Sequence, residues 1–169
     1  PDALENVLKT LREIAPDHEL ICLFGCGGDR DKTKRPEMAK IAEKMADRII
    51  VTSDNSRTEK TSDIMADIKA GFELSGRARS LFIEDREQAI RTAIMIAGQG
   101  ATILLAGKGH ETYQEVCGVK HHLDEREIVA EYLKEYFAEA GVKSTVQRID
   151  DTHANFIVHV EGESHDKHV

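Results

Sequence analysis

Apolar residues follow two alternating patterns along this chain, and these patterns predict strands and helices in succession. Four short runs are nearly continuously apolar, at 20–24, 49–52, 81–83 and 102–106. Such runs are typical of strands buried on both faces, as in a parallel sheet. Helical spacing of apolar residues predicts helices at 3–14, 37–46, 62–71 (with Ser62 as N-cap), 85–97 and 125–137. The alternation predicts a doubly wound α/β domain, with a mostly parallel sheet and helices on both faces.

Polar and glycine-rich segments follow three of the four predicted strands. They are residues 25–30, 53–57 and 107–111, whereas residues 84–86 after the third strand are interpreted mainly as the start of a helix. Ligands of a doubly wound sheet bind in a crevice at the carboxyl ends of its strands. The three segments are therefore expected to meet at one edge of the sheet and to form a binding site there.

Side chains of both charge signs occur in the three segments. Arg30 suits a two-pronged contact with a carboxylate, and Arg57 also suits a carboxylate. Asp54 and Glu111 can accept hydrogen bonds from an ammonium group, and the amide of Asn55 can serve either end of an amino acid. This combination predicts a site that binds a zwitterion.

Each segment also has a plainer interpretation. The glycines at 25, 27 and 28 let the backbone approach an anion or a nucleotide, or they simply make a tight turn. Asp54 and Asn55 are common in turns and helix caps. Lys108 is a candidate partner for an anion, whereas His110 in the same loop is more often structural than catalytic. Since no nucleophile–base pair or metal cluster stands out, we predict no catalytic residue and no metal site in this chain.

Size and charge narrow the class of protein. The 169 residues suit a domain over residues 1–137 and an extension over 138–169, partly disordered or with one added strand near 156–160.

The formal net charge of −8 argues against non-specific nucleic-acid binding and against docking on anionic membranes. Three cysteines without framework spacing, and no apolar run of membrane-spanning length, favour a cytoplasmic protein. The start at Pro1, without Met, indicates a piece of a longer protein.

Three longer segments carry a family resemblance. They are FGCGGDRDK at 24–32, TSDNSR at 52–57 and AGKGHETYQ at 106–114, in this order along the chain. Together they resemble the C-terminal domain of the Mur ligases, in the branch that extends UDP-N-acetylmuramoyl-L-alanyl-D-glutamate during peptidoglycan synthesis. The resemblance covers roughly residues 1–137 and implies a Rossmann-like fold within an ATP-dependent, amide-forming ligase.

The resemblance implies a division of labour among three domains. In that family the first domain binds the UDP-sugar dipeptide and the central domain binds ATP and Mg²⁺. The third domain, which this chain resembles, holds the incoming amino acid and closes over the active site. Its expected partners are its own N-terminal and central domains and the small-molecule substrates, and the isolated domain is expected to be inactive.

The family's amino-acid site falls on a defined set of residues here: Arg30, Asp54, Asn55, Ser56, Arg57, Gly107 and Glu111. Asp29 resembles the position that reaches the ribose of ATP. Members that use meso-diaminopimelate carry Asp-Asn-Pro-Arg, in which the arginine binds the distal carboxylate, and Ser56 stands here in place of that proline. Because lysine lacks the distal carboxylate, Arg57 favours meso-diaminopimelate as the substrate.

Two alternatives stay open. One is the lysine-adding homologue of the same family. The other is a stand-alone module that binds an amino acid or a nucleotide and has a regulatory role. A P-loop domain encoded directly upstream of Pro1 would favour the ligase, whereas a natural start near Pro1 would favour the binding module.

Overall fold

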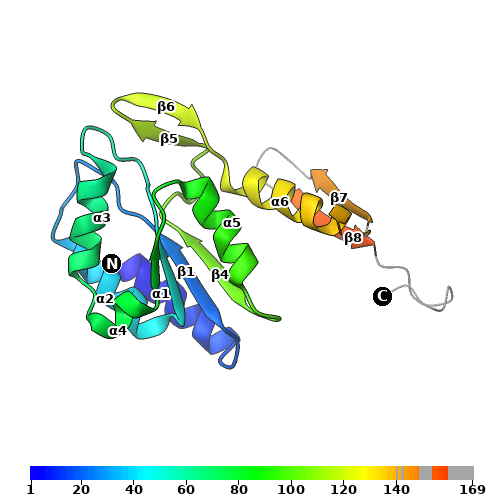
Figure 1. The fold of residues 1–169 in the computed structure, drawn as a ribbon, viewed down its shortest axis with the longest axis horizontal. Helices are drawn as coiled ribbons and strands as arrows, with labels where there is room; N and C mark the ends of the chain where they lie inside the picture. Colours follow the sequence, from blue (N-terminus) through cyan, green and yellow to red (C-terminus); the bar gives the residue numbers. More distant parts are fainter. Residues whose placement is uncertain (140, 142, 149–153, 160–169) are drawn as a thin grey trace. The chain divides into compact units, whose positions relative to one another are not determined.

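A four-stranded parallel sheet is the framework of the first of two structural units, which spans Pro1–Glu125. The computed structural model describes residues 1–139, 141, 143–148 and 154–159. The strands are β1 Leu20–Phe24, β2 Arg48–Val51, β3 Ser80–Phe82 and β4 Thr102–Ala106. They lie in the order β3-β2-β1-β4, and all neighbouring pairs are parallel (Figure 1). The predicted α/β class with a mostly parallel sheet is confirmed.

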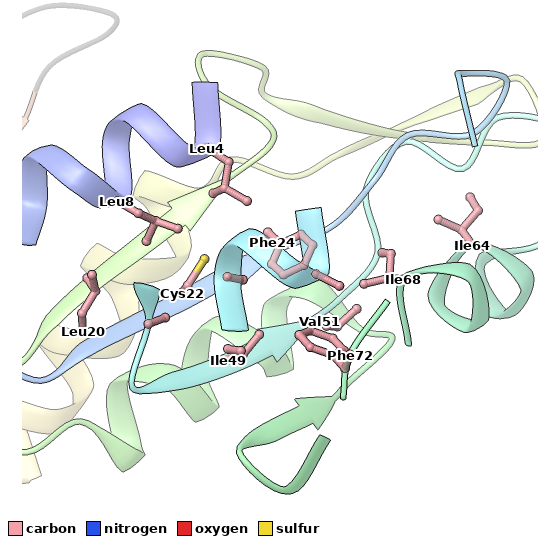
Figure 2. Packing of buried hydrophobic residues seen from close by; sticks show 13 residues of the cluster. Leu4, Leu8, Leu20, Cys22, Phe24, Ile49, Val51, Ile64, Ile68 and Phe72 are labelled. Carbon is pink, nitrogen blue, oxygen red and sulfur yellow. The ribbon is translucent and has the colours of Figure 1, made fainter. Parts of the chain in front are cut away.

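Helices cover both faces of this sheet because successive strand residues point to opposite sides. On one face Cys22, Phe24 and Val51 pack against α1 Asp2–Ile14, α2 Lys34–Met45 and α3 Thr61–Ala70. Figure 2 shows this core, in which Leu8 of α1 and Ile68 of α3 meet the strand residues. On the other face α5 Arg86–Ile96 packs on β1, β2 and β4 through its buried residues Ala89, Ile90 and Ala93.

The helix starts differ from the predicted ones for local reasons. Helix α2 begins three residues earlier than predicted, since Pro36 lies in its first turn, where proline is tolerated. The prediction of Ser62 as an N-cap is wrong, because the Lys60 carbonyl already accepts hydrogen bonds from the Asp63 and Ile64 N–H groups. Helix α5 has Asp85 as its N-cap, which accepts a 2.9 Å hydrogen bond from the Gln88 N–H.

Two elements of the first unit are absent from the sequence prediction. Helix α4 Leu74–Ala78 is a short turn before β3. A hairpin of β5 Tyr113–Val116 and β6 Val119–His122 follows the third loop. Its turn residues Cys117 and Gly118 have φ angles of 50° and 76°, the backbone of a tight two-residue hairpin turn. The hairpin matters for the site because it contacts the loop after β2.

The second unit spans Arg126–Val169 and is described by itself. Its described part contains helix α6 Glu125–Glu139, predicted at 125–137, followed by the antiparallel pair β7 Lys143–Arg148 and β8 Ala154–His159. Strand β8 overlaps the predicted strand near 156–160, whereas β7 was not predicted. The tail at 161–169 lies outside the described residues, and the domain boundary at 137 stays a prediction. No helix among the described residues is long and apolar enough to span a membrane.

Helix α1 offers a matched pair of substitutions to test this core. Leu8 is 0% exposed and Val7 is 44% exposed. We predict that Leu8→Ala lowers the free energy of unfolding by about 2–5 kcal/mol, because it leaves a cavity against the sheet. Val7→Ala should change it by less than about 1 kcal/mol. Urea unfolding followed by circular dichroism measures both, and equal losses would contradict the packing described.

Candidate functional site

The loops after β1 and β2 approach each other closely at the carboxyl edge of the sheet. A Cβ at Gly25 would lie 2.5 Å from the Thr52 carbonyl oxygen, and one at Gly28 would overlap the Ser56 carbonyl. The Gly28 N–H donates a 2.8 Å hydrogen bond to the Asn55 carbonyl. These two glycines therefore permit contact between the loops, which favours the tight-turn interpretation over a backbone cradle for an anion.

Asn55 joins the second loop to the third. It is buried, with 4% of its surface exposed. Its Oδ1 accepts from the Glu115 N–H at 2.8 Å and from Lys108 Nζ at 3.3 Å. Its Nδ2 donates to Glu111 Oε2 at 2.9 Å. One side chain thus connects the loop after β2, the loop after β4 and strand β5.

Lys108 lies inside the protein and does not face solvent. Its side chain is 0% exposed, and its Nζ lies 2.6 Å from the Tyr113 carbonyl oxygen and 3.6 Å from Asp54 Oδ1. Burial lowers the pKa of Lys108, and the charge of Asp54 opposes this shift. The prediction that Lys108 binds a ligand anion is wrong in this structure, because protein atoms surround its ammonium group. His110 of the same loop is exposed.

Arg57 and Arg30 flank Gly27. A Cβ at Gly27 would lie 2.9 Å from Arg57 Nη1 and 3.7 Å from Arg30 Cγ. The backbone of Arg57 has a φ of 51° and bonds to the β5–β6 hairpin through the Glu115 carbonyl and the Cys117 N–H. Its Nη1 donates a 2.6 Å hydrogen bond to the Gly28 carbonyl. Two arginine side chains from different loops therefore lie beside Gly27, with Arg30 exposed and Arg57 half-buried.

The predicted acceptors of the site lie on the second and third loops. Asp54 Oδ2 lies 3.0 Å from the position that a Cβ would take at Gly107, so the loop after β4 passes directly over this carboxylate. Glu111 is half-buried and bound to Asn55. The structure thus connects Asp54, Gly107 and Glu111 in one cluster, through Asn55 and Lys108.

Two other predicted residues have structural roles. Ser56 is 1% exposed, and its hydroxyl has no hydrogen-bond partner in the part of the chain that the structure describes. Its backbone supports the Gly28 contact. Asp29 accepts a 2.6 Å hydrogen bond from the Thr58 hydroxyl, so its carboxylate links the first loop to the second. Its expected contact with the ribose of ATP stays a proposal.

An ion cluster around the buried Arg35, beside the first loop, is absent from the sequence analysis. Arg35 is 1% exposed and donates to Glu59 at 2.8 and 3.0 Å, and to Asp67 at 2.8 Å. Glu59 also accepts from the Asp29 N–H at 2.7 Å. Hydrogen bonds from Arg35 and from the Asp29 backbone lower the pKa of Glu59 to about 2. This cluster holds the loops after β1 and β2 together.

Arg86 joins the ends of β2 and β4 from below the loops. It is 1% exposed, and its two terminal nitrogens donate to the carbonyls of Ser53 and Ala106 at 2.8 and 2.9 Å. Its Nε donates to Glu125 at 2.8 Å. The sequence identified only the helix start at this residue, since an arginine in a first turn usually lies in solvent.

A cleft of about 460 Å³ opens beside the first loop and the start of α2. Its lining residues are Pro1, Gly25, Cys26, Gly27, Arg30, Asp31, Lys34, Arg35 and Met38. Arg30 is the predicted site residue in this lining, whereas the cluster around Asp54 lies outside it. Among the residues that the structure describes, no group of three or more His, Cys, Asp or Glu side chains could hold a metal ion.

Comparison with known proteins identifies the family. The family model for the glutamate ligase domain of Mur ligases matches residues 1–109. A protein of Bacteroides fragilis is 49% identical over 139 residues, which are 82% of this chain and 28% of that protein. A protein of Synechococcus elongatus is 55% identical over 128 residues, 75% of this chain and 25% of that protein. Both are named UDP-N-acetylmuramoyl-L-alanyl-D-glutamate--2,6-diaminopimelate ligase.

A solved structure of an enzyme with the same name is also similar to this chain. The superposition has a TM-score of 0.75 at 45% sequence identity, over 80% of this chain and 28% of the solved one. The chain therefore spans about a quarter of the length of the relatives it matches, 28% in the first and 25% in the second.

The depressed pKa of Glu59 predicts how stability depends on pH. A carboxyl whose folded pKa lies near 2 and whose ordinary value is 4.5 stabilises the fold above pH 4.5, and this contribution disappears as the pH falls toward 2. We predict that Glu59→Gln is less stable than the wild type at neutral pH and that the difference narrows over this interval. Exposed Glu37→Gln is the control, and thermal melts at several pH values provide the measurement. A constant difference across that interval would contradict the role of Glu59.

Replacing Arg86 tests whether the strand ends depend on it. We predict that Arg86→Met lowers the free energy of unfolding by about 3–5 kcal/mol, because Glu125 and two carbonyls lose their buried donor. Arg91→Met on the same helix removes a partly exposed pair with Glu87 and should cost less than about 1 kcal/mol. Denaturant unfolding compares the two variants, and a small loss for Arg86→Met would show that the strand ends are held by other contacts.

Proposed function

The chain belongs to the Mur ligase family, whose glutamate ligase domain it contains, and we propose that it is the amino-acid-binding part of an ATP-dependent ligase. The proposed reaction joins meso-diaminopimelate to UDP-N-acetylmuramoyl-L-alanyl-D-glutamate in peptidoglycan synthesis. Relatives that carry this activity in their names are about half identical to the chain, at 49% and 55%. One observation in the site carries the proposal: side chains of both charge signs gather at the carboxyl edge of one sheet.

The substrate that fits this arrangement has more than one carboxylate. Meso-diaminopimelate carries a carboxylate and an ammonium group at each end, whereas lysine has a single carboxylate. Arg30 and Arg57 flank Gly27 and can bind carboxylates by paired N–H groups. A lysine would leave one guanidinium without its anion, which disfavours the lysine-adding alternative. The acidic cluster of Asp54 and Glu111, with Asn55 and Gly107 beside it, suits the ammonium groups, and Ser56 supports the loop between them.

In this proposal, the domain contributes to the reaction by positioning the incoming amino acid. ATP would donate a phosphoryl group to the glutamate carboxylate of the UDP-sugar dipeptide, giving an acyl phosphate and ADP. We place ATP and Mg²⁺ mainly on the central domain, with Asp29 as the contact to the ribose. The residues of this chain hold the incoming amine in line for attack, which lowers the entropic part of the barrier. Closure of this domain over its own N-terminal and central domains excludes water from the reactive carboxyl. This proposal places the protein in the cytoplasm, where its small-molecule substrates are made.

A binding titration tests the substrate directly. We predict that the 169-residue chain binds meso-diaminopimelate at least about tenfold more tightly than L-lysine, a difference of roughly 1.4 kcal/mol. Arg57→Ala should remove this preference, because its guanidinium meets the second carboxylate. Arg77→Ala, on the exposed surface of α4, is the control and should bind as the wild type does. Isothermal titration calorimetry provides the affinities.

The outcomes separate the alternatives. Tighter binding of lysine would overturn the substrate and leave the family unchanged. If the chain binds neither amino acid, the test is repeated with the full-length protein. There, Arg57→Ala should raise the KM for meso-diaminopimelate. Tight binding of an amino acid by a natural protein that starts near Pro1 would favour the regulatory module.

A further inference from the structure

The Asn55 side chain can adopt only one orientation of its amide in this structure. Two donors, the Glu115 N–H and Lys108 Nζ, face its oxygen, and the Glu111 carboxylate faces its nitrogen. A flipped amide would direct N–H groups against both donors and an oxygen against a carboxylate. The contacts of Asn55 therefore determine the orientation by themselves.

Lys108 is the charged member of this arrangement. Its Nζ is anchored at 2.6 Å on the Tyr113 carbonyl, reaches Asn55 Oδ1 at 3.3 Å and lies 3.6 Å from Asp54 Oδ1. An ammonium group has three N–H donors and no acceptor. All three donors therefore have an acceptor or a counter-charge within the protein. Such a fully enclosed cation acts on its neighbours and does not bind the ligand.

We propose that Lys108 is a positioning residue for amino-acid binding, which it serves by orienting the Asn55 amide toward Glu111. This inference rests on the proposed function, since it concerns the same site. Glu111 receives the Asn55 N–H on Oε2, and its Oε1 remains to accept from an ammonium group of the substrate. The charge of Lys108 also offsets that of Asp54, which lies 3.6 Å from its Nζ.

The loss of Lys108 has a defined consequence. Without it, the Asn55 oxygen keeps one neutral donor, the Glu115 N–H, and the amide is held in its orientation less strongly. The hydrogen bond that orders the Glu111 side chain is then weaker. Because an ordered carboxylate binds an ammonium group with less entropy to lose, affinity for the amino acid falls although no ligand contact is removed.

The test compares Lys108→Met with Lys40→Met, a lysine on the exposed face of α2. Methionine has a similar length but donates no hydrogen bond. In the ligand-free proteins, NMR of the Asn55 side-chain NH₂ reports its orientation through Overhauser contacts to the Glu111 methylenes. Calorimetry with meso-diaminopimelate reports affinity. We expect Lys108→Met to weaken the Asn55–Glu111 contacts and to raise Kd about tenfold, whereas Lys40→Met should stay within about twofold of the wild type.

The outcomes are distinct from those of the proposed function. Unchanged Asn55 signals and an unchanged Kd in a folded Lys108→Met would overturn the inference. If that variant does not fold, the NMR spectrum of the wild type tests the inference. Contacts between the Asn55 NH₂ and Glu111 would support the inference. Contacts between the Asn55 NH₂ and Lys108, in place of Glu111, would overturn it. If the Asn55 signals respond as expected but this chain binds no diaminopimelate, the orienting role of Lys108 stands, and the KM of the full-length protein decides the proposed substrate.

Discussion

The site depends first on Arg86, a buried guanidinium that holds two strand ends together. In a parallel sheet the strands end at the same edge, and their last carbonyl groups need donors where the ladder stops. Arg86 bonds to the carbonyls of Ser53 and Ala106 across β1, which lies between β2 and β4. Glu125 balances its charge. The loops after β2 and β4 start at these two carbonyls, so one side chain connects the origins of both loops.

Two further buried cations, Arg35 and Lys108, also connect loops at this edge of the sheet. Arg35 connects the loop after β1 to the loop after β2 through Glu59, and Lys108 connects the loop after β2 to the hairpin through Asn55 and Tyr113. Each has its charge balanced inside the protein, as burial requires. Among the predicted site residues, Arg30 is exposed and Arg57 is half-buried, which is why the proposed function assigns the ligand carboxylates to them. The enclosed cations thus support the loops of the candidate site, whereas the accessible ones are the candidates for binding a ligand.

Sequence reasoning succeeded where the signal is local or periodic. Continuous apolar runs located β1 and β4 to the residue, and the polar segments after the strands do meet at one edge. It failed for Lys108, Arg35 and Arg86, because a cation in a loop or a first turn looks the same in sequence whether it is solvated or enclosed. It also missed the hairpin at β5 and β6, because both short strands are rich in polar residues and lack an apolar pattern; β5 is largely half-buried and β6 is exposed.

The sequence by itself determined the class of fold, the edge of the sheet that carries the site and the family, because these depend on apolar periodicity and on motifs whose order is written along the chain. Only the tertiary structure decided which charged residues are enclosed by protein and which stay accessible to solvent. That distinction depends on contacts between residues far apart in sequence, such as Asn55 with Glu111 or Arg86 with Ala106. Burial and the hydrogen-bond partners of a charge exist only once the strands have brought their loops together.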